Sequence, residues 1–486
     1  MVVLPSTRTK LMPASELIAK TATEIVALLK AGEVTTFDLL DALEVRIAEV
    51  EPAVNALPTL CFERARDRAK SLAGKPMTER GVLAGMPVAI KDLLNVAGVR
   101  STQGSPIFAD TVPDTSDVAV TTLEAAGGVV YAKSNTPEFG AGANTFNEVF
   151  GATLNPWDTS RSCAGSSGGS AVALASGTAW LASGSDLGGS LRNPASFCGI
   201  VGFRPTPGRV AHGPGALPFG SMSVEGPMAR TVADCALMLD AMTGQSPVDP
   251  MSLERPAQSF VSSTASGRKP KRVAFSLDLG GITPVDPEVA TIVERAARRF
   301  EEIGCVVEEA SPDFSDVQQI FQTLRAMAFA ASKKDLLVRH RDQLKPEVIW
   351  NIEKGLALST EEVAAAELAR GRLYHRVRAF YETYDLVLSP ATIAPPYPIE
   401  QRYLEECNGH RFSKYIEWCT VAYAFTCAAL PAISVPAGFT AGGLPVGLQI
   451  AGPPRGEAAV LSAAALFEQV APWAHTLPVD PRVPRG

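Results

Sequence analysis

The sequence lacks an excess of positive charge. Its 486 residues include 51 acidic residues and 44 lysines and arginines, so the formal net charge is −7. A nucleic-acid-binding surface needs clustered cations to neutralise phosphates, and this balance therefore argues against DNA or RNA as a partner. The one dense run of cations, residues 268–272, follows a proline- and serine-rich stretch, and we expect it to be a solvated surface segment.

Closely spaced cysteines are also absent. The eight cysteines contain no C-x-x-C pair and stand among apolar neighbours, so we expect buried free thiols, with no disulfide and no metal site. A chain of this length buries a core large enough to fold without such links. The cysteines are Cys61, Cys163, Cys198, Cys235, Cys305, Cys407, Cys419 and Cys427.

Long apolar runs are rare as well. The first ten residues, MVVLPSTRTK, contain no apolar core of the kind that a secretory signal needs. Residues 421–439 carry no charge over a length close to that of a membrane span, but Pro431 and Pro436 interrupt them. We therefore expect a soluble, cytoplasmic protein without a membrane span.

What the sequence does contain is an alternation of helical and strand patterns. Thr21 and Glu24 form the pattern of a capping box at a helix start, and residues 87–90 predict a short buried strand that ends at Lys91. Such alternation is typical of a layered α/β protein. Length alone would allow two or three domains, but large α/β enzymes often form one, and we expect a single domain over residues 1–486.

Two regions differ in composition from the rest. Residues 245–272 are rich in proline, serine and basic residues, which predicts a surface connection. Asp286 and Pro287 then predict a helix start. The charge-rich, mostly helical residues 287–384 that follow are the region where we expect a cap over a substrate site.

One segment concentrates residue types that serve catalysis. Residues 165–190 read GSSGGSAVALASGTAWLASGSDLGGS, with seven serines and seven glycines around an alanine-rich centre. Glycine lets backbone amides approach a reacting atom, and serine supplies hydroxyl groups. This segment is therefore where we expect a nucleophile and an oxyanion hole.

Two other interpretations fit the same residues. In the first, glycine and serine only permit close packing of a helix on a sheet. In the second, residues 165–169 match the G-x-S-x-G motif of α/β-hydrolase esterases, with Ser167 as nucleophile and a histidine as base. That motif needs a strand directly before it, whereas residues 155–162 predict a loop, and none of the five histidines has a distinctive context.

A third interpretation pairs serine hydroxyls with a lysine base. Lys91 follows an apolar strand, where burial would lower the pKa of its amine toward neutrality. Together with several other motifs, these residues resemble the amidase signature family of Ser–cis-Ser–Lys hydrolases over nearly the whole chain. The motifs are GMPVAIKD (85–92), KSNTPEF (133–139), GSSGGS (165–170), GSDLGGSLRNPA (184–195), CGIVGFRPT (198–206), GPMARTVAD (226–234) and PVGLQIAGP (445–453).

The resemblance implies a large mixed, twisted β-sheet with helices on both faces, a helical cap and no cofactor. It makes Ser190 the nucleophile, Ser166 the serine that follows a cis peptide bond, and neutral Lys91 the ultimate base. We see no catalytic role for Ser185. The backbone amides of the oxyanion hole would be those of Leu187, Gly188, Gly189 and Ser190, and the supporting residues would be Ser167, Asp186 and Arg192.

The substrate is less well defined by the sequence than the chemistry is. We expect a neutral, fairly hydrophobic amide, anilide, urethane or ester, and the whole chain also looks similar to the carbamate-hydrolysing urethanases of the family. The cap residues Ile320, Phe321, Leu324, Met327 and Phe329 serve equally well as pocket lining or as helix core. The expected substrate-binding residues are Gly140, Ala141, Gly142, Arg209, Leu217 and Phe219.

Partners other than a small-molecule substrate and water are not expected, and the protein is predicted to be a monomer or homodimer. Two alternatives remain beside the esterase. One is the subunit that releases ammonia in tRNA-dependent amidotransfer, although no segment argues for partner subunits. The other is a non-catalytic binding protein of the same fold, which would tolerate changes at Ser190.

Overall fold

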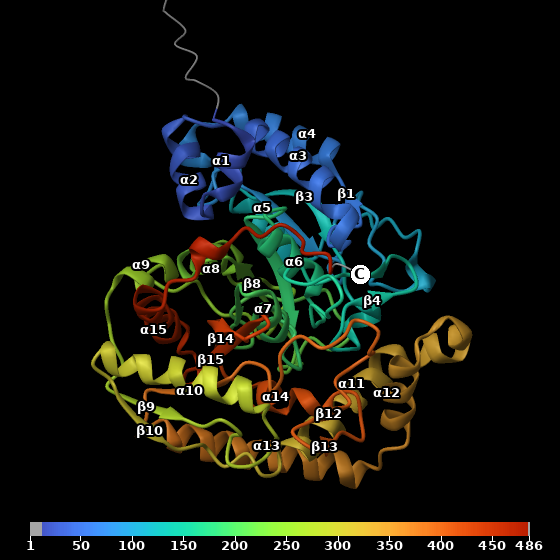
Figure 1. Ribbon diagram of the computed structural model, residues 1–486. Coiled ribbons are helices and arrows are strands. Elements are labelled where there is room, and N and C mark those ends of the chain that lie inside the picture. The colour runs from blue at the N-terminus through green and yellow to red at the C-terminus, as the bar shows by residue number, and fades with distance from the viewer. Residues whose placement is uncertain (1–11, 485–486) are drawn as a thin grey trace, which may run out of the picture.

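One large β-sheet forms the centre of the computed structural model, which describes residues 12–484 (Figure 1). The first ten residues, for which no secretory signal is expected, lie outside this range. In spatial order the eleven strands are β1 (Thr59–Leu60), β3 (Val129–Ser134), β2 (Pro87–Lys91), β6 (Leu181–Asp186), β8 (Val224–Ala229), β7 (Val201–Arg204), β14 (Ala432–Phe439), β15 (Pro445–Ala451), β11 (Leu386–Pro390), β9 (Arg272–Phe275) and β10 (Val306–Glu309).

The sheet is mixed, as expected. Strands β3, β2 and β6 run parallel to one another near one edge, and β11, β9 and β10 do so at the other. The strands from β6 through β8, β7, β14 and β15 to β11 are antiparallel neighbours. Two short hairpins stand apart from this sheet: β4 (Phe146–Asn147) with β5 (Gly151–Ala152), and β12 (Glu406–Cys407) with β13 (His410–Arg411).

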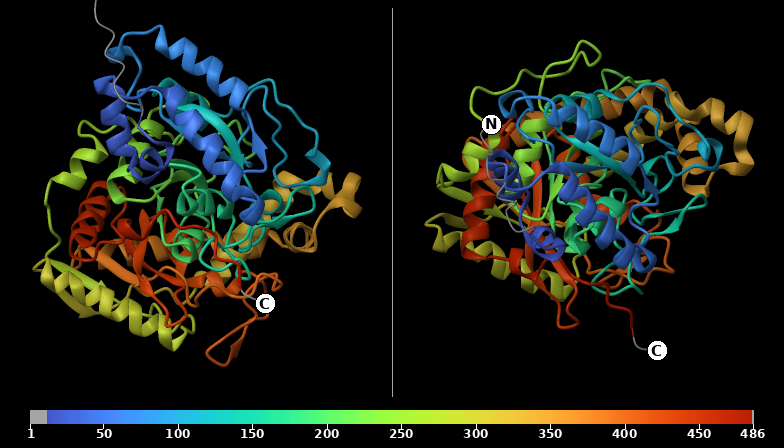
Figure 2. Two further views of the ribbon diagram at one scale, coloured as in Figure 1. Left: turned by 45° about the horizontal axis from the view of Figure 1, so that its top comes forward. Right: turned by 90° about the horizontal axis from the view of Figure 1, so that it is seen from above.

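Helices cover both faces of the sheet (Figures 1 and 2). Their sequence signals are local: Thr21 and Glu24 form the predicted capping box, and Asp286 caps the helix that opens at Pro287. The helices are α1 (Ala14–Ala19), α2 (Ala22–Ala31), α3 (Thr36–Val54), α4 (Phe62–Ala73), α5 (Val118–Ala125), α6 (Gly168–Ser176), α7 (Arg192–Cys198), α8 (Val232–Met242), α9 (Phe260–Ala265), α10 (Pro287–Glu302), α11 (Val317–His340), α12 (Pro346–Leu356), α13 (Thr360–Phe380), α14 (Thr420–Cys427) and α15 (Glu457–Val470).

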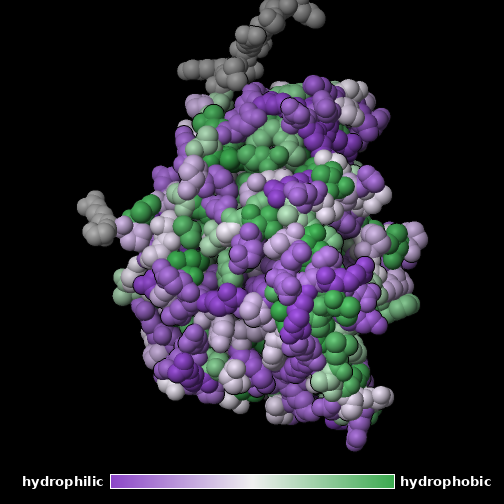
Figure 3. Space-filling view, turned by 90° about the vertical axis from the view of Figure 1, so that its right-hand side faces the viewer, coloured by the Kyte–Doolittle hydropathy of each residue, from purple (hydrophilic) through white to green (hydrophobic). Residues whose placement is uncertain are grey.

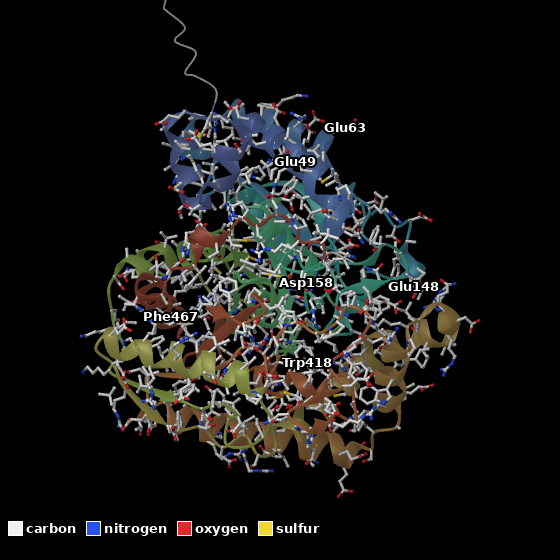
Figure 4. All side chains as sticks on the ribbon, viewed as in Figure 1. Glu49, Glu63, Glu148, Asp158, Trp418 and Phe467 are labelled. Atoms are coloured by element: carbon white, nitrogen blue, oxygen red, sulfur yellow. The ribbon has the colours of Figure 1, made fainter. Side chains whose placement is uncertain are left out.

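The region expected to be a cap, residues 287–384, is not one structural unit. Its first helix, α10, packs on β14, β15 and β11, and β10 is the edge strand of the main sheet. The ring of Phe300 in α10 stacks on Phe467 of α15, which Figure 4 labels within the body of the molecule. The other three helices of the region form a separate group, in which α11 packs on α12, α13 and α14. The apolar stripe of α10 predicts a buried face, but nothing in it tells which element that face contacts.

The connection at residues 245–272 is mostly exposed, yet it contains helix α9, which packs on α8 and α15 through the buried Phe260. The eight cysteines are all free, and all but the half-buried Cys61 are buried. Within residues 12–484 no helix combines the length and the apolar character required to cross a bilayer.

Candidate active site

The site begins where two parallel strands end side by side. Strand β2 ends at Lys91 and β6 ends at Asp186, and the two strands are paired through Ala89 and Ala182. Helix α6 starts directly after Ser166 and Ser167. The alanine-rich centre of residues 165–190 thus forms most of α6 and the start of β6, which return the chain to the neighbourhood of Lys91.

Three hydroxyl groups surround the amine of Lys91. Its Nζ lies 2.7 Å from Ser166 Oγ, 2.9 Å from Ser167 Oγ and 2.9 Å from Ser185 Oγ. The backbone amide of Lys91 also donates to Ser183 Oγ at 3.0 Å. No carboxylate contacts this amine among the described residues, so its partners are neutral.

Burial decides the protonation state of this lysine. The Lys91 side chain is 1% exposed, and burial lowers its pKa to about 7, while the more distant charges of Asp186 and Glu225 act in the opposite direction. A lysine with a pKa near neutrality is a competent proton acceptor at physiological pH. The amine can therefore take a proton from a hydroxyl group that it contacts.

The peptide bond between Gly165 and Ser166 is cis, and Ser166 is 2% exposed. Ser190 lies next to this turn, because its carbonyl oxygen accepts a hydrogen bond from the Ser167 amide at 3.3 Å. Ser190 is half-buried. The structure thus brings Lys91, Ser166 and Ser190, which are far apart in the sequence, to one place.

Several backbone amides at and just before Ser190 in the chain are without a hydrogen-bond acceptor among the described residues. Within residues 12–484, the amides of Leu187, Gly188 and Ser190 donate no hydrogen bond, which leaves them free for a substrate oxygen. The Gly189 amide, expected in the same group, instead donates to Asp186 Oδ1 at 3.1 Å. Gly189 has a φ of +105°, and a Cβ atom there would lie 2.6 Å from Ala422 Cβ, so this position requires glycine.

A buried ionic network holds this loop. Arg192 donates to both oxygens of Asp186, at 3.0 and 2.9 Å, and the Leu191 amide donates to Asp186 Oδ2 at 3.2 Å. Burial would raise the pKa of the Asp186 carboxyl, but the charges of Arg192 and Arg204 hold it well below its usual range. Asp186 therefore remains ionised and fixes the loop that carries Ser190.

Two members of this environment were missed by sequence reasoning. Ser185, for which no catalytic role was expected, contacts the Lys91 amine, and Arg204 donates to Asp186 from β7. The alternation of Ser183 and Ser185 along β6 is a usable signal for the first, since side chains two apart in a strand point to one face. Arg204 lies within the motif CGIVGFRPT, which gives no indication of its ionic partner.

The predicted substrate-binding glycines lie near the site. A Cβ atom at Gly140 would be 3.3 Å from Ser166 Oγ, and one at Gly142 would be 3.2 Å from Lys345 Nζ. Ala141, between them, belongs to a small apolar cluster with Phe139, Leu344, Val348 and Ile352. The segment 140–142 therefore runs from Ser166 toward the start of α12.

Apolar side chains face the proposed oxyanion hole from the cap side. A Cβ atom at Gly188 would lie 3.4 Å from the ring of Phe321 and 3.5 Å from Ile416 Cδ1. Phe321 of α11 stacks on Tyr423 of α14 with centroids 4.0 Å apart. Ile320 and Leu324 are buried in the main core, whereas Met327 and Phe329 are half-buried.

Three predicted substrate contacts are not brought to this site. Arg209 contacts Glu457 at 3.5 Å and lies over the ring of Phe260, so its charge serves the packing of α9 and α15. Leu217 and Phe219 lie on a surface loop and are 39% and 76% exposed. Proline and glycine in that loop gave no indication of the direction in which its apolar side chains point.

The esterase alternative finds no geometric support. Residues 155–162 contain no strand, and Ser167 Oγ contacts Lys91 and the backbone of Ser185. None of the five histidines, all within the described residues, is a hydrogen-bond partner of Ser167. His212, the histidine nearest in sequence, pairs with Glu225 through Nδ1 at 2.9 Å.

Comparisons with known proteins match the chain to one family over most of its length. The sequence model of the family described as Amidase matches residues 38–461. The chain is 36% identical to an acylamidase of Rhodococcus erythropolis, covering 94% of this chain and 97% of the relative. It is 37% identical to a glutamyl-tRNA(Gln) amidotransferase subunit of Moorella thermoacetica, covering 93% and 97%. Among solved structures, a bacterial aryl acylamidase of the amidase signature enzymes superposes with a TM-score of 0.87 at 28% identity, covering 94% and 97%.

Proposed function

The chain belongs to the amidase signature family and is a hydrolase of carbon–nitrogen bonds, and we propose that it cleaves small-molecule amides through an acyl-enzyme on Ser190. The observation that carries this proposal is the buried Lys91 amine, whose polar contacts among residues 12–484 are all hydroxyl groups. A lysine in that setting has no charge to neutralise and is suited to proton transfer.

Each step uses a group already named. Ser190 Oγ attacks the carbonyl carbon, and its proton passes through Ser166 Oγ to the neutral amine of Lys91. The same proton then returns through Ser166 to the leaving nitrogen, and the C–N bond breaks. Water attacks the acyl-enzyme by the same proton route, and this step releases the acid and restores Ser190.

The free backbone amides of Leu187, Gly188 and Ser190 support the second part of the proposal, an oxyanion hole. Negative charge develops on the carbonyl oxygen as Ser190 attacks, and preorganised donors stabilise it without reorganising. The loss of one such donor typically costs about 3 to 4 kcal/mol of barrier. The Gly189 amide would join this group only by sharing its proton with Asp186.

The apolar surface near Gly188 supports the substrate class. Phe321 and Ile416 offer an uncharged wall next to the reacting carbonyl. We therefore infer that the group at the reacting bond is neutral and fairly hydrophobic, as in acyl amides, anilides, urethanes and esters. The sequence similarity to acylamidases agrees with amides as the first class to assay.

The test is covalent labelling followed by intact-mass measurement. A fluorophosphonate should add to the wild-type protein and to Ser167→Ala, and should fail to add to Ser190→Ala. Ser166→Ala and Lys91→Met should react about 100-fold more slowly or worse, because the proton acceptor is lost. Labelling that survives Ser190→Ala and disappears in Ser167→Ala would overturn the assignment. A panel of acyl anilides, aryl carbamates and esters then ranks the substrates.

A second candidate function rests on the 37% identity to the amidotransferase relative. In that role the same serine would release ammonia from an amide donor for transfer by partner subunits. Release of ammonia from glutamine without cleavage of any acyl anilide would favour this candidate. Cleavage of the anilides by the isolated chain would favour the stand-alone amidase.

A further inference from the structure

A cavity of about 450 Å³ lies at the start of helix α12, outside the hydroxyl cluster of the site. Gly104, Glu138, Phe146, Leu344, Lys345 and Arg402 contribute to its wall. It lies on the side of the molecule where β4 and α12 meet, a face with mixed hydrophilic and hydrophobic areas (Figures 1 and 3). One residue of its wall, Lys345, is a buried lysine.

The amine of Lys345 has no hydrogen-bond partner among the described residues. The side chain is 9% exposed, and its nearest carboxylate oxygen, Glu347 Oε2, is 3.9 Å away. Burial lowers the pKa of this amine to about 8, so the protein carries an ammonium group that is costly to desolvate. A buried cation that makes no hydrogen bond is stabilised when a ligand brings an anion within hydrogen-bond distance of it.

The neighbouring carboxylates are already committed. Glu347 accepts two hydrogen bonds from Arg402, at 2.9 and 2.7 Å. Glu138 accepts from Ser105 Oγ at 2.6 Å and from the Lys345 backbone amide at 2.8 Å.

The ring of Phe146 contacts both cations of the wall, with Lys345 Nζ and Arg402 Cζ at 4.7 and 4.8 Å from its centroid. Two other acidic residues of the wall, Glu148 and Asp342, are exposed to solvent. Figure 4 shows Glu148 at the outer edge of the molecule. The inner wall therefore holds one buried amine, that of Lys345, to which no side chain of the described residues is hydrogen-bonded.

The segment Gly140–Gly142 connects this cation to the reacting groups. Gly140 approaches Ser166 Oγ and Gly142 approaches Lys345 Nζ, with virtual Cβ distances of 3.3 and 3.2 Å. Two residues span at most about 7 Å, so Ser166 Oγ and Lys345 Nζ are on the order of 10 Å apart. Ser166 delivers the proton to the leaving nitrogen. The part of the substrate that lies along this segment is therefore the amine part, which leaves, and not the acyl part.

We propose that the cavity at α12 binds a carboxylate on the amine part of the substrate, with the ammonium of Lys345 as its partner. This inference rests on the proposed amide hydrolysis. It specifies the substrate class as N-acyl derivatives of ω-amino acids, in which an apolar chain separates the reacting nitrogen from the carboxylate. Such a substrate is neutral and apolar at the reacting amide bond and carries its negative charge at the far end, next to Lys345.

The experiment compares matched leaving groups. The substrates are N-butyryl ω-amino acids whose amino acid part has about 4 to 10 carbon atoms, which brackets the estimated separation of Ser166 Oγ and Lys345 Nζ. N-butyryl ω-amino alcohols of equal length are the uncharged references. Release of the free amine is measured at about pH 7. The wild type should prefer the carboxylate by about 10- to 100-fold in kcat/KM at one length in the series, as expected for a charge-assisted hydrogen bond.

Three variants separate the role of Lys345 from a structural one. Lys345→Met should abolish the preference by raising KM for the carboxylates, with unchanged kinetics for the alcohols, and Lys345→Arg should retain much of it. Lys354→Met, on the same helix and outside the wall of the cavity, is the matched control and should keep the preference. The wild-type preference should also fade above about pH 8, where Lys345 loses its charge.

The failures are distinguishable. If the wild type cleaves both series equally, or if Lys345→Met slows both equally, the carboxylate subsite is wrong and the amidase function stands. If neither series nor any acyl anilide is cleaved by a protein that folds, the proposed function itself fails.

Discussion

Two buried lysines on neighbouring strands have opposite electrostatic roles. Lys133 of β3 contacts Asp92 at 2.6 Å and Ser101 Oγ at 2.7 Å, so it forms a buried ion pair. The hydrogen bonds of the Lys91 amine in β2 to the part of the chain that is described all go to serine hydroxyl groups. Burial lowers the pKa of both amines, but the contacting Asp92 carboxylate opposes this shift at Lys133, whereas no carboxylate of the described residues contacts Lys91, whose pKa is about 7.

This difference predicts the pH dependence of activity. Catalysis needs the neutral amine of Lys91, whose pKa is about 7, so kcat/KM should rise with pH through about 7 and then level off. Lys91→Met should lower kcat by about 100- to 10,000-fold, the usual contribution of a general base. The measurement is kcat/KM for an acyl anilide between about pH 5 and pH 10. A maximum below about pH 6 would contradict the lysine-base mechanism.

The carboxylate of Glu225, beside the site, should influence the pH at which kcat/KM rises. Glu225 on β8 is the register partner of Ser185 on β6, so both side chains are on the face of the sheet that carries the Lys91 amine. Burial lowers the pKa of Lys91, and the negative charge of Glu225 opposes that shift. Glu225→Gln should therefore shift the rise of kcat/KM toward lower pH. Glu124→Gln, which removes a carboxylate paired with Arg64, is the control that should leave the rise in place.

At the scale of elements, the site depends on how closely helix α6 approaches strand β3. The Gly169 amide donates to the Asn135 carbonyl at 3.2 Å, directly after β3 ends. A Cβ atom at Gly169 would lie 2.3 Å from the Asn135 nitrogen and 2.6 Å from the Ala56 carbonyl oxygen. Both obstacles are backbone atoms that cannot rotate away, so the first turn of α6 is fixed against the sheet.

Gly169→Ala tests this contact. The added methyl group should push α6 away from β3, lower the free energy of unfolding by about 1 to 3 kcal/mol, and slow fluorophosphonate labelling by displacing Ser166 from Lys91. Gly371 is the matched control, because it lies inside helix α13 with open space where its Cβ would be. Gly371→Ala should stabilise the protein by about 0.5 to 1 kcal/mol and leave labelling unchanged. Denaturant unfolding and labelling rates measure both effects.

How far the sequence predicts these elements depends on whether the signal is local. The strand that ends at Lys91, the helix cap at Asp286 and the serines at both ends of residues 165–190 were predicted, because each rests on a short pattern. The contact of Arg209 with Glu457 and the assignment of α10 to the main sheet depend on residues distant in the chain. Single-sequence patterns carry no information about such pairs.

At the scale of the whole molecule, the buried charges divide into paired and unpaired groups. Asp186 with its two arginines and Lys133 with Asp92 are paired inside the sheet layer. Within residues 12–484, the amines of Lys91 and Lys345 form no hydrogen bond with a carboxylate, and each faces a place where a substrate is proposed to bind. The protein thus loses stability at two positions, which is expected where function rather than folding determines the residue.

The cost of Lys91 should be visible in global stability. Its pKa is about 7 in the folded protein and 10.5 in an unfolded chain, so the unfolded state binds more protons between these values. The destabilisation is complete below about pH 7 and is lost as the pH rises toward 10.5, with a magnitude on the order of 5 kcal/mol. The free energy of unfolding of Lys91→Met should therefore rise less with pH than that of the wild type. The variant should exceed the wild type in stability by the largest amount near pH 6.

Lys133→Met is the control for that measurement, because it removes a buried lysine that has an anionic partner. The change leaves the Asp92 carboxylate uncompensated in the core, and it should destabilise the protein by about 3 to 5 kcal/mol. Chemical denaturation of both variants between about pH 6 and pH 10 gives the comparison. A Lys91→Met variant that keeps the wild-type slope would mean that the Lys91 amine is charged in the folded protein, and a charged amine cannot accept the proton of Ser190.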